Sequence, residues 1–140
     1  MPVCEILTLA VTRMHGGVCI AGMTTESDPV TGLRWVRPVR EHGHVLWGDI
    51  TTVEEHVLRC FDVVALNLIR PQPSPPYGED WVTDFVKRRP HVMRRLEGGR
   101  RERFLSKYLD SDPGQVLDLQ ERSLCLIKPD QIKGCFRLDA

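Results

Sequence analysis

Four prolines within residues 71–76 (PQPSPP) constrain the fold more than any other feature of this chain. Proline fixes its own φ and has no N–H to donate, so this segment can continue neither a helix nor the ladder of a sheet. It follows the longest apolar run, Phe61–Ile69, which is typical of a central strand. We therefore expect a stiff, extended connection at residues 71–79.

The first half of the sequence reads mainly as β structure. Val3–Thr12 and Val18–Met23 are apolar runs separated by His15-Gly16-Gly17, a pattern that predicts a hairpin. Turn residues at 28–32 precede a third strand, Leu33–Arg37, in which Trp35 and Arg37 share one face. Thr52-Val53-Glu54-Glu55 matches a capping box and predicts a short helix over Val53–Arg59.

The second half reads differently, because acidic caps and apolar pairs at helical spacing replace the strand pattern. Three helices, a turn and two short strands are expected there, at Asp80–Arg89, His91–Glu97, Arg100–Leu109, Asp112–Gly114, Ser123–Ile127 and Cys135–Leu138.

Composition limits the class of protein. With 140 residues, 41 % hydrophobic and 27 % charged, the chain can form one compact domain or two very small modules. No stretch approaches the ~18 apolar residues that cross a bilayer, and Glu5 argues against a secretory leader. The five cysteines are scattered and odd in number, so we expect a reduced cytoplasmic chain without disulfides.

The predicted fold class is α+β, mainly β: one or two small OB-like β-barrels with a helical insertion in the second half. Residues 1–70 would form one OB-like half and residues 71–79 the connection. Residues 80–140 would form a basic helical segment with short strands that complete a truncated second half, or the two halves would merge into one compact domain.

Charge is unevenly distributed along the chain. Residues 86–107 contain nine basic and two acidic residues, a net charge of +7, and the rest of the chain carries −7. Arginine, whose planar guanidinium pairs with phosphates, dominates this segment. The alternative is that these cations solvate helix faces or pair with the acidic remainder. The candidate phosphate contacts are Arg88, Arg89, Arg94, Arg95, Arg100, Arg101 and Arg103.

A second candidate surface combines aromatic and basic residues near the expected hairpin. Trp35 and Arg37 lie on the third strand, and Arg13 and His15 lie in or next to the preceding turn. Such alternation on a small barrel binds single strands by stacking and phosphate neutralisation. Trp35 could instead belong to the core.

Evidence for catalysis is weaker. Glu79, Asp80 and Asp84 could hold Mg²⁺ in a nuclease, or His15 could act as a general acid or base. Acids at a helix N-terminus also have a purely structural explanation. His42-x-His44 lacks the partners of a zinc site, and no phosphate-binding loop or dinucleotide motif is present. We therefore expect no metal, no cofactor and no enzymatic activity.

An ordered set of motifs resembles the dual OB-containing domain family of bacterial and phage proteins. The match spans nearly the whole chain. The motifs are LAVTRMHGG (9–17), VCIAG (18–22), GLRWVRPV (32–39), FDVVALNL (61–68), GEDW (78–81) and SLCLI (123–127).

This resemblance implies two small OB-like barrels with helical insertions that bind nucleic acid without catalysis. The family's Glu-Asn-Trp is Glu-Asp-Trp here, with Asp80 in the place of asparagine, which puts fixed chemistry at this position in doubt. The sequence given ends at Ala140, soon after the last motif, so the second barrel is either truncated or completed by a second chain. A homodimer is compatible with the second case.

The sequence thus predicts a non-catalytic nucleic-acid-binding module, with DNA or RNA as its partner. An interaction module for a protein or a small metabolite, and a metal-dependent nuclease, are the alternatives.

Overall fold

The computed structural model describes residues 3–26, 34–120 and 122–129. This part of the chain contains strands β1 (Val3–Met14), β2 (Gly17–Thr24), β3 (Trp35–Val39), β4 (Asp62–Pro71), β5 (Asp80–Asp84) and β6 (His91–Arg95), followed by helices α1 (Gly99–Lys107) and α2 (Pro113–Leu119).

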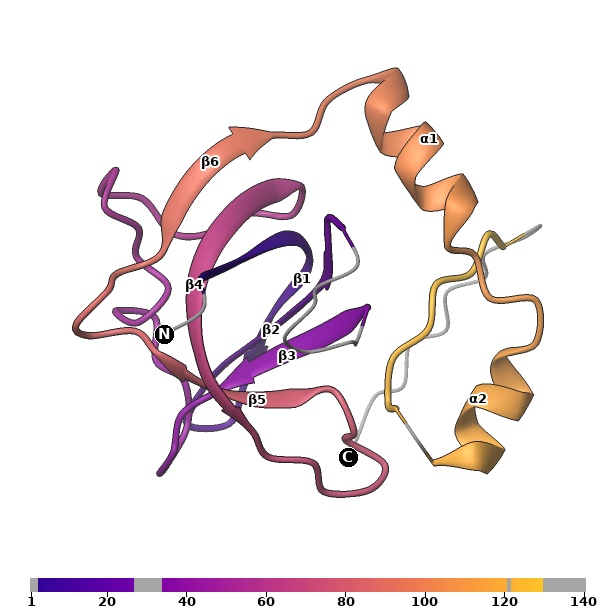
Figure 1. Cartoon of the computed structure of the whole chain (residues 1–140), viewed down its shortest axis with the longest axis horizontal. Coiled ribbons are helices and arrows are strands. Elements are labelled where there is room, and N and C mark those ends of the chain that lie inside the picture. The colour runs from indigo at the N-terminus through magenta and orange to yellow at the C-terminus, as the bar shows by residue number, and fades with distance from the viewer. Residues whose placement is uncertain (1–2, 27–33, 121, 130–140) are drawn as a thin grey trace, which may run out of the picture.

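Five of the strands close into a barrel in the order β1-β2-β3-β5-β4, with β4 pairing back onto β1 (Figure 1). The barrel is mixed, because β3 and β5 run parallel and the other neighbours run antiparallel. β6 is an additional strand that shares one edge of β4 with β5. The two helices follow the barrel, as the predicted mainly-β class with helices in the second half requires.

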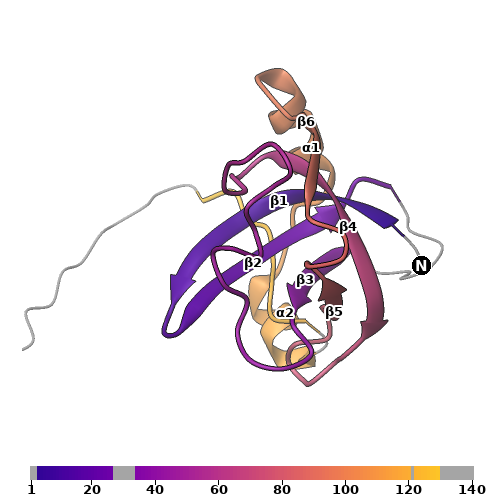
Figure 2. The ribbon, with the colours of Figure 1, turned by 90° about the vertical axis from the view of Figure 1, so that its left-hand side faces the viewer.

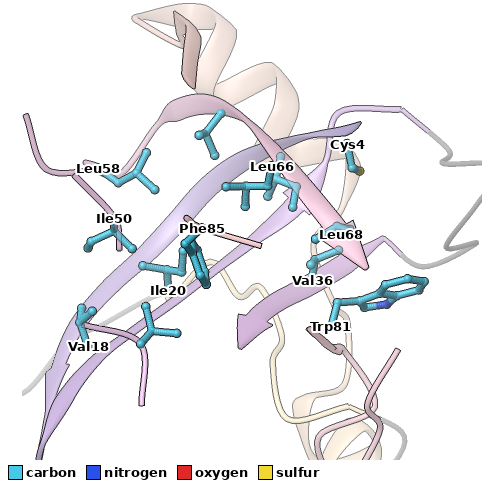
Figure 3. Packing of buried hydrophobic residues seen from close by; sticks show 13 residues of the cluster. Cys4, Val18, Ile20, Val36, Ile50, Leu58, Leu66, Leu68, Trp81 and Phe85 are labelled. Carbon is cyan, nitrogen blue, oxygen red and sulfur yellow. The ribbon is translucent and has the colours of Figure 1, made fainter. Parts of the chain in front are cut away.

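The barrel interior is filled by one apolar cluster to which nearly every strand contributes (Figure 3). Ile6 of β1, Val36 of β3 and Val64 of β4 are each at most 2 % exposed. Leu66 and Leu68 continue the buried row of β4, which pairs with three other strands. The predicted central strand is therefore confirmed, and it runs as far as Pro71.

The predicted hairpin is also confirmed, and one of its glycines has a steric role. A Cβ on Gly22 of β2 would overlap the carbonyl oxygen of Leu7 and approach the Ile6 side chain to 2.7 Å. Next to this contact β1 has an irregularity between Thr8 and Ala10. Bulges bend a strand and increase its twist. Gly22 thus allows β1 and β2 to approach closely where the barrel wall curves.

The proline-rich segment turns back instead of running extended. Ser74 and Tyr77 pair across its turn, with hydrogen bonds of 2.6 Å and 3.3 Å between their main chains. Because β4 and β5 then pair antiparallel, the strands on both sides of residues 71–79 belong to the same barrel.

Three expected helices are wrong. Residues 53–59 form turns and an isolated bridge, and the other two expected helices are replaced by β5 and β6. Trp81 and Phe85, which suggested a helical apolar pair, both enter the barrel core. Closing the barrel requires β5 between β3 and β4, and this pairing outweighs the local helical pattern.

The later elements agree in part. The helix expected at Arg100–Leu109 is confirmed as α1. The turn expected at Asp112–Gly114 is instead the start of α2: Asp112 is the N-cap, and its carboxylate accepts a hydrogen bond from the Gln115 N–H at 3.1 Å. No strand is assigned within residues 122–129, where Ser123–Ile127 was expected. The expected turn at 28–32, Leu33 and the strand Cys135–Leu138 lie outside the described residues. No helix in the described ranges is long and apolar enough to cross a membrane.

We call α1, α2 and residues 122–129 the C-terminal arm, which lies beside the barrel in Figure 1. Two of the contacts that connect the arm to the barrel involve Ser123 and Tyr108. In the first, the N–H and the hydroxyl of Ser123 both donate to the buried carboxylate of Glu79. A second places the Arg34 guanidinium 4.4 Å from the centre of the Tyr108 ring. These contacts join elements far apart in the sequence and connect the C-terminal arm to the barrel.

Candidate functional site

The basic segment predicted from residues 86–107 is divided among three structures. Residues 87–89 lie in the connection between β5 and β6, Arg94 and Arg95 lie on β6, and the remaining cations lie on α1. Figure 1 shows the connection and α1 at opposite ends of β6. A five-residue strand spans roughly 17 Å. The cations therefore do not form one helical face.

Two of the predicted phosphate contacts are held by nearby acceptors. Arg89 donates to the carbonyl oxygen of Thr52 at 2.7 Å and lies 3.4 Å from a carboxylate oxygen of Glu55. Arg94 forms an ion pair with Glu5 at 3.5 Å. These exposed pairs neutralise charge locally, as the alternative interpretation of the segment expected.

Two further arginines are structural. Arg95 donates to the fully buried carboxylate of Asp62 at 3.0 Å. Arg101 donates to the carbonyl oxygen of Leu96 at 2.7 Å, and its guanidinium lies 4.2 Å from the centre of the Phe61 ring. Arg95 thereby fixes β6 to β4, and Arg101 fixes α1 to the barrel.

The remaining cations of α1 form an exposed stripe. Arg100, Arg103 and Lys107 are spaced i, i+3 and i+7, which places them on one side of the helix. All three are exposed, and their side chains form no ion pair or hydrogen bond within the described residues. They line an open hollow of about 840 Å³ together with Leu96 and Phe104. We call this surface the α1 stripe. Lys87 and Arg88, at the far end of β6, are likewise exposed.

The second predicted surface is only partly accessible. Trp35 is 7 % exposed, so its ring is not available to stack on a base in this structure. Arg37 donates from Nε and Nη2 to both carboxylate oxygens of Asp80, at 2.6 Å and 2.8 Å, and lies 4.2 Å from the centre of the Tyr77 ring. The hydrogen bonds with Asp80 raise the pKa of Arg37 above its usual value despite partial burial.

Arg13 and His15 are exposed at the closed end of the β1–β2 hairpin, which extends past β3 and β5 (Figure 2). The loop of residues 40–47 packs against this end, since the Val18 N–H donates to the carbonyl oxygen of Val45 at 2.8 Å. This loop brings exposed His44 to the hairpin, and Trp47 at the end of the loop is exposed as well. Sequence reasoning missed Trp47, because no motif or spacing connects it with the hairpin.

The carboxylates considered for a nuclease are engaged with protein groups. Glu79 binds Ser123, and Asp80 binds Arg37. Asp84 accepts hydrogen bonds at 3.0 Å from the N–H groups of Val86 and Lys87. Among the described residues, no group of three or more histidine, cysteine or acidic side chains is arranged to hold a metal ion.

Asp110 joins the end of α1 to the last described segment. Its carboxylate accepts from Arg122 at 2.5 Å and from the Leu126 N–H at 2.9 Å, and its own N–H donates to the Leu126 carbonyl at 2.7 Å. Desolvation by burial acts to raise the pKa of Asp110, but the hydrogen bonds from Arg122 and Leu126 outweigh it, and the net pKa lies below the usual value of 3.8.

Acidification should therefore loosen the arm. A carboxylate with a depressed folded-state pKa contributes stability above its unfolded pKa and loses it as pH falls through the folded value. We expect the Leu126 amide to exchange hydrogen faster, relative to an unstructured peptide, as pH falls below about 4. Asp110→Asn should exchange fast already at neutral pH and lose the acid-dependent change. The same profile in both proteins would contradict the assignment.

The motif segments identified in the sequence meet in this structure through specific contacts. Arg37 of WVRPV pairs with Asp80 of GEDW, and Glu79 of GEDW pairs with Ser123 of SLCLI. Comparison with curated proteins and with solved structures finds no match. The family model described as the dual OB-containing domain does match, over residues 4–135, and confirms the resemblance, so this chain belongs to that family as an OB-like barrel domain.

Proposed function

We propose that the protein is a non-catalytic nucleic-acid-binding module whose α1 stripe contacts phosphates. The observation that carries the proposal is the stripe itself: three exposed cations without partners among the described residues, on one side of a helix that the barrel holds in place. Arginine and lysine side chains of this kind neutralise phosphates and release counterions.

The geometry of the stripe suits a nucleic-acid strand. Arg100 and Lys107 are separated by seven residues, which corresponds to about 10 Å along a helix. Measured along the axis of a B-form duplex, this distance corresponds to about three base-pair steps of ~3.4 Å. Phe104, half-buried in the same hollow, supplies an apolar surface against which a sugar or base can pack.

Arg13 and His15 extend the proposed interface to the barrel. They are exposed on the projecting hairpin, and the adjoining loop adds Trp47, whose side chain is 41 % exposed. An accessible indole can stack on a base. In this proposal Trp47 takes the stacking role first expected of Trp35.

A titration of labelled single- and double-stranded DNA and RNA by fluorescence anisotropy tests this function. We expect binding to at least one class of probe, with log Kd rising linearly with log salt concentration. Three phosphate contacts give a slope of about 2 to 3. Absence of binding to all four probes at low salt, or binding without salt dependence, would contradict the proposal.

A second candidate function, binding of a protein partner, is favoured by apolar side chains exposed on the arm. Leu117, Leu119 and Ile127 are 66 %, 57 % and 52 % exposed. β6 also has one edge without a partner strand among the described residues, and such edges favour pairing with another chain, including a second copy of this one. Sedimentation velocity over a range of concentrations separates the homodimer from a monomer.

A further inference from the structure

A small pocket lies where the β1–β2 hairpin, the end of β3 and the loop of residues 40–45 meet. It has a volume of about 140 Å³, and Cys19, Arg37, Pro38, Val39, His44 and Val45 are among its lining residues. Pockets for drug-sized ligands are larger, about 300–1,000 Å³. This hairpin pocket therefore suits a single ring-sized group.

Two glycines of the hairpin allow the pocket to form. Gly16 has φ +83°, a conformation that favours glycine, and a Cβ there would lie 3.0 Å from the His44 ring. A Cβ on Gly17 would overlap the Val45 carbonyl oxygen and approach the His44 side chain to 2.9 Å. The His-Gly-Gly motif thus lets the loop close over the hairpin, where VCIAG contributes Cys19 and WVRPV contributes Arg37.

Arg37 is fixed in the pocket wall with donors to spare. A guanidinium carries five N–H donors. Asp80 takes one from Nε and one from Nη2, and the Tyr77 ring covers one face of the group. The Nη1 protons and the second Nη2 proton form no hydrogen bond within the described residues. This outer pair of nitrogens is a preorganised fork for two adjacent acceptors.

Two carboxylates outside the pocket offset the positive charge of its arginines. The Asp80 carboxylate lies against the Arg37 guanidinium, and Asp49 lies 3.9 Å from Arg40, the other arginine of the pocket. An anion therefore gains less from these arginines than from unpaired ones, whereas a neutral ring is not repelled by the nearby carboxylates. The apolar walls of Val39 and Val45 likewise suit the faces of a ring.

We propose that the hairpin pocket binds one unstacked guanine base of the nucleic acid. The N7 and O6 atoms of guanine are adjacent acceptors that arginine reads with two hydrogen bonds. Adenine offers a donor beside its N7, and thymine offers a single acceptor on the corresponding edge. The proposal rests on the proposed function, because it places a base of the bound strand in this pocket, but it makes a separate prediction at Cys19.

Protection of Cys19 from alkylation tests the pocket directly. Wild-type protein is treated with iodoacetamide in the presence of oligothymidylate, alone or with one central guanine, adenine or cytosine, and modification is measured by mass spectrometry. We expect the guanine probe to slow alkylation of Cys19 about tenfold relative to the others, the discrimination of one good bidentate contact. Alkylation of Cys60, which is exposed outside this pocket, is the internal control and should not depend on the base.

The outcomes separate the two proposals. If all probes bind by anisotropy and none protects Cys19 selectively, the guanine pocket is wrong and the proposed function stands. If no oligonucleotide binds, the proposed function fails, and guanosine monophosphate replaces the strand as the probe. Stronger protection of Cys19 by guanosine monophosphate than by adenosine monophosphate would then retain the guanine pocket. Equal protection by both, or by inorganic phosphate, identifies an anion site and overturns the guanine assignment.

A variant provides a second measurement. Arg37→Lys keeps the positive charge beside Asp80 but removes the outer pair of nitrogens. We expect the preference for the guanine probe to disappear, so that the probes with a central guanine, adenine or cytosine bind with Kd values within about twofold of one another. An unchanged urea unfolding midpoint verifies that the variant is folded, and a retained guanine preference in a folded variant would exclude Arg37 as the reader.

Discussion

Reversing two charges of the α1 stripe, with Arg100→Glu and Arg103→Glu together, is expected to weaken nucleic-acid binding about 100-fold or more near 0.1 M salt. Each reversal removes an attraction and adds a repulsion, and one pair of unit charges at contact is worth about 1 kcal/mol in water. The slope of log Kd against log salt should fall by about two, because two phosphate contacts are lost. Anisotropy titrations of variant and wild type at several salt concentrations measure both effects.

The chain offers a matched control for this experiment. Lys87→Glu with Arg88→Glu makes the same change in net charge at the opposite end of β6, and these residues are also exposed. If α1 provides the contacts, the control should weaken binding less than about fivefold. Equal losses in both variants would show that overall charge attracts the nucleic acid and that the stripe has no special role. Neither variant removes a contact of the barrel, so both should remain folded.

The largest effect on stability is expected at Asp62. Its side chain is fully buried, and its oxygens accept hydrogen bonds from the Arg95 guanidinium at 3.0 Å and the Arg59 N–H at 2.9 Å. Asp62→Ala removes both hydrogen bonds, although Arg95 keeps one to the Cys60 carbonyl oxygen at 3.0 Å, and each hydrogen bond to a charged group is worth about 1.5–3 kcal/mol. A domain of this size has a total stability of about 5–15 kcal/mol. The variant should therefore unfold at much lower urea concentration, as circular dichroism would measure.

Glu55→Ala is the control for Asp62→Ala. It also removes the carboxylate partner of an arginine, Arg89, but that ion pair is exposed. Exposed pairs contribute about 0–1 kcal/mol, so the urea midpoint should hardly move. Comparable losses in the two variants would mean that burial does not distinguish these carboxylates. A small loss in Asp62→Ala alone would show that β6 holds to β4 without its ion pair.

The residues of these two predictions, Asp62 and the α1 stripe, are connected through β6 and Arg101. Asp62 and Arg95 fix β6 to the barrel at the point from which the chain continues toward α1. The Arg101 guanidinium of α1 then packs on the ring of Phe61, the residue directly before Asp62. Arg95 and Arg101, which bind protein groups, thus connect α1 to the rest of the domain, and α1 carries the exposed Arg100 and Arg103.

Local sequence patterns predicted an element correctly where the barrel requires the same backbone conformation as the pattern. The apolar runs at Val3–Thr12 and Phe61–Ile69 and the glycines at the first turn each correspond to a strand or a turn of the barrel. In these segments the side-chain pattern and the barrel wall require the same backbone. The order of motifs likewise sufficed to assign the family.

The same local reasoning failed between residues 80 and 95. An acidic cap and an i, i+4 apolar pair indicated a helix, but Trp81 and Phe85 are buried in a barrel that needs a strand at this place. Hydrogen bonding to β3 and β4 supplies the partners that a helix would have satisfied internally, so propensity was overridden. No sequence feature within residues 80–95 indicates that they pair with β3 and β4.

The sequence by itself determined the barrel class, the family and the concentration of positive charge in residues 86–107. Only the tertiary structure decided which of those charges are available. Arg89, Arg94, Arg95 and Arg101 find their acceptors on segments as distant as Glu5, whereas Arg100, Arg103 and Lys107 face the open hollow. The physical reason is that a charge is free or neutralised according to its neighbours in space, and long-range strand pairing sets those neighbours.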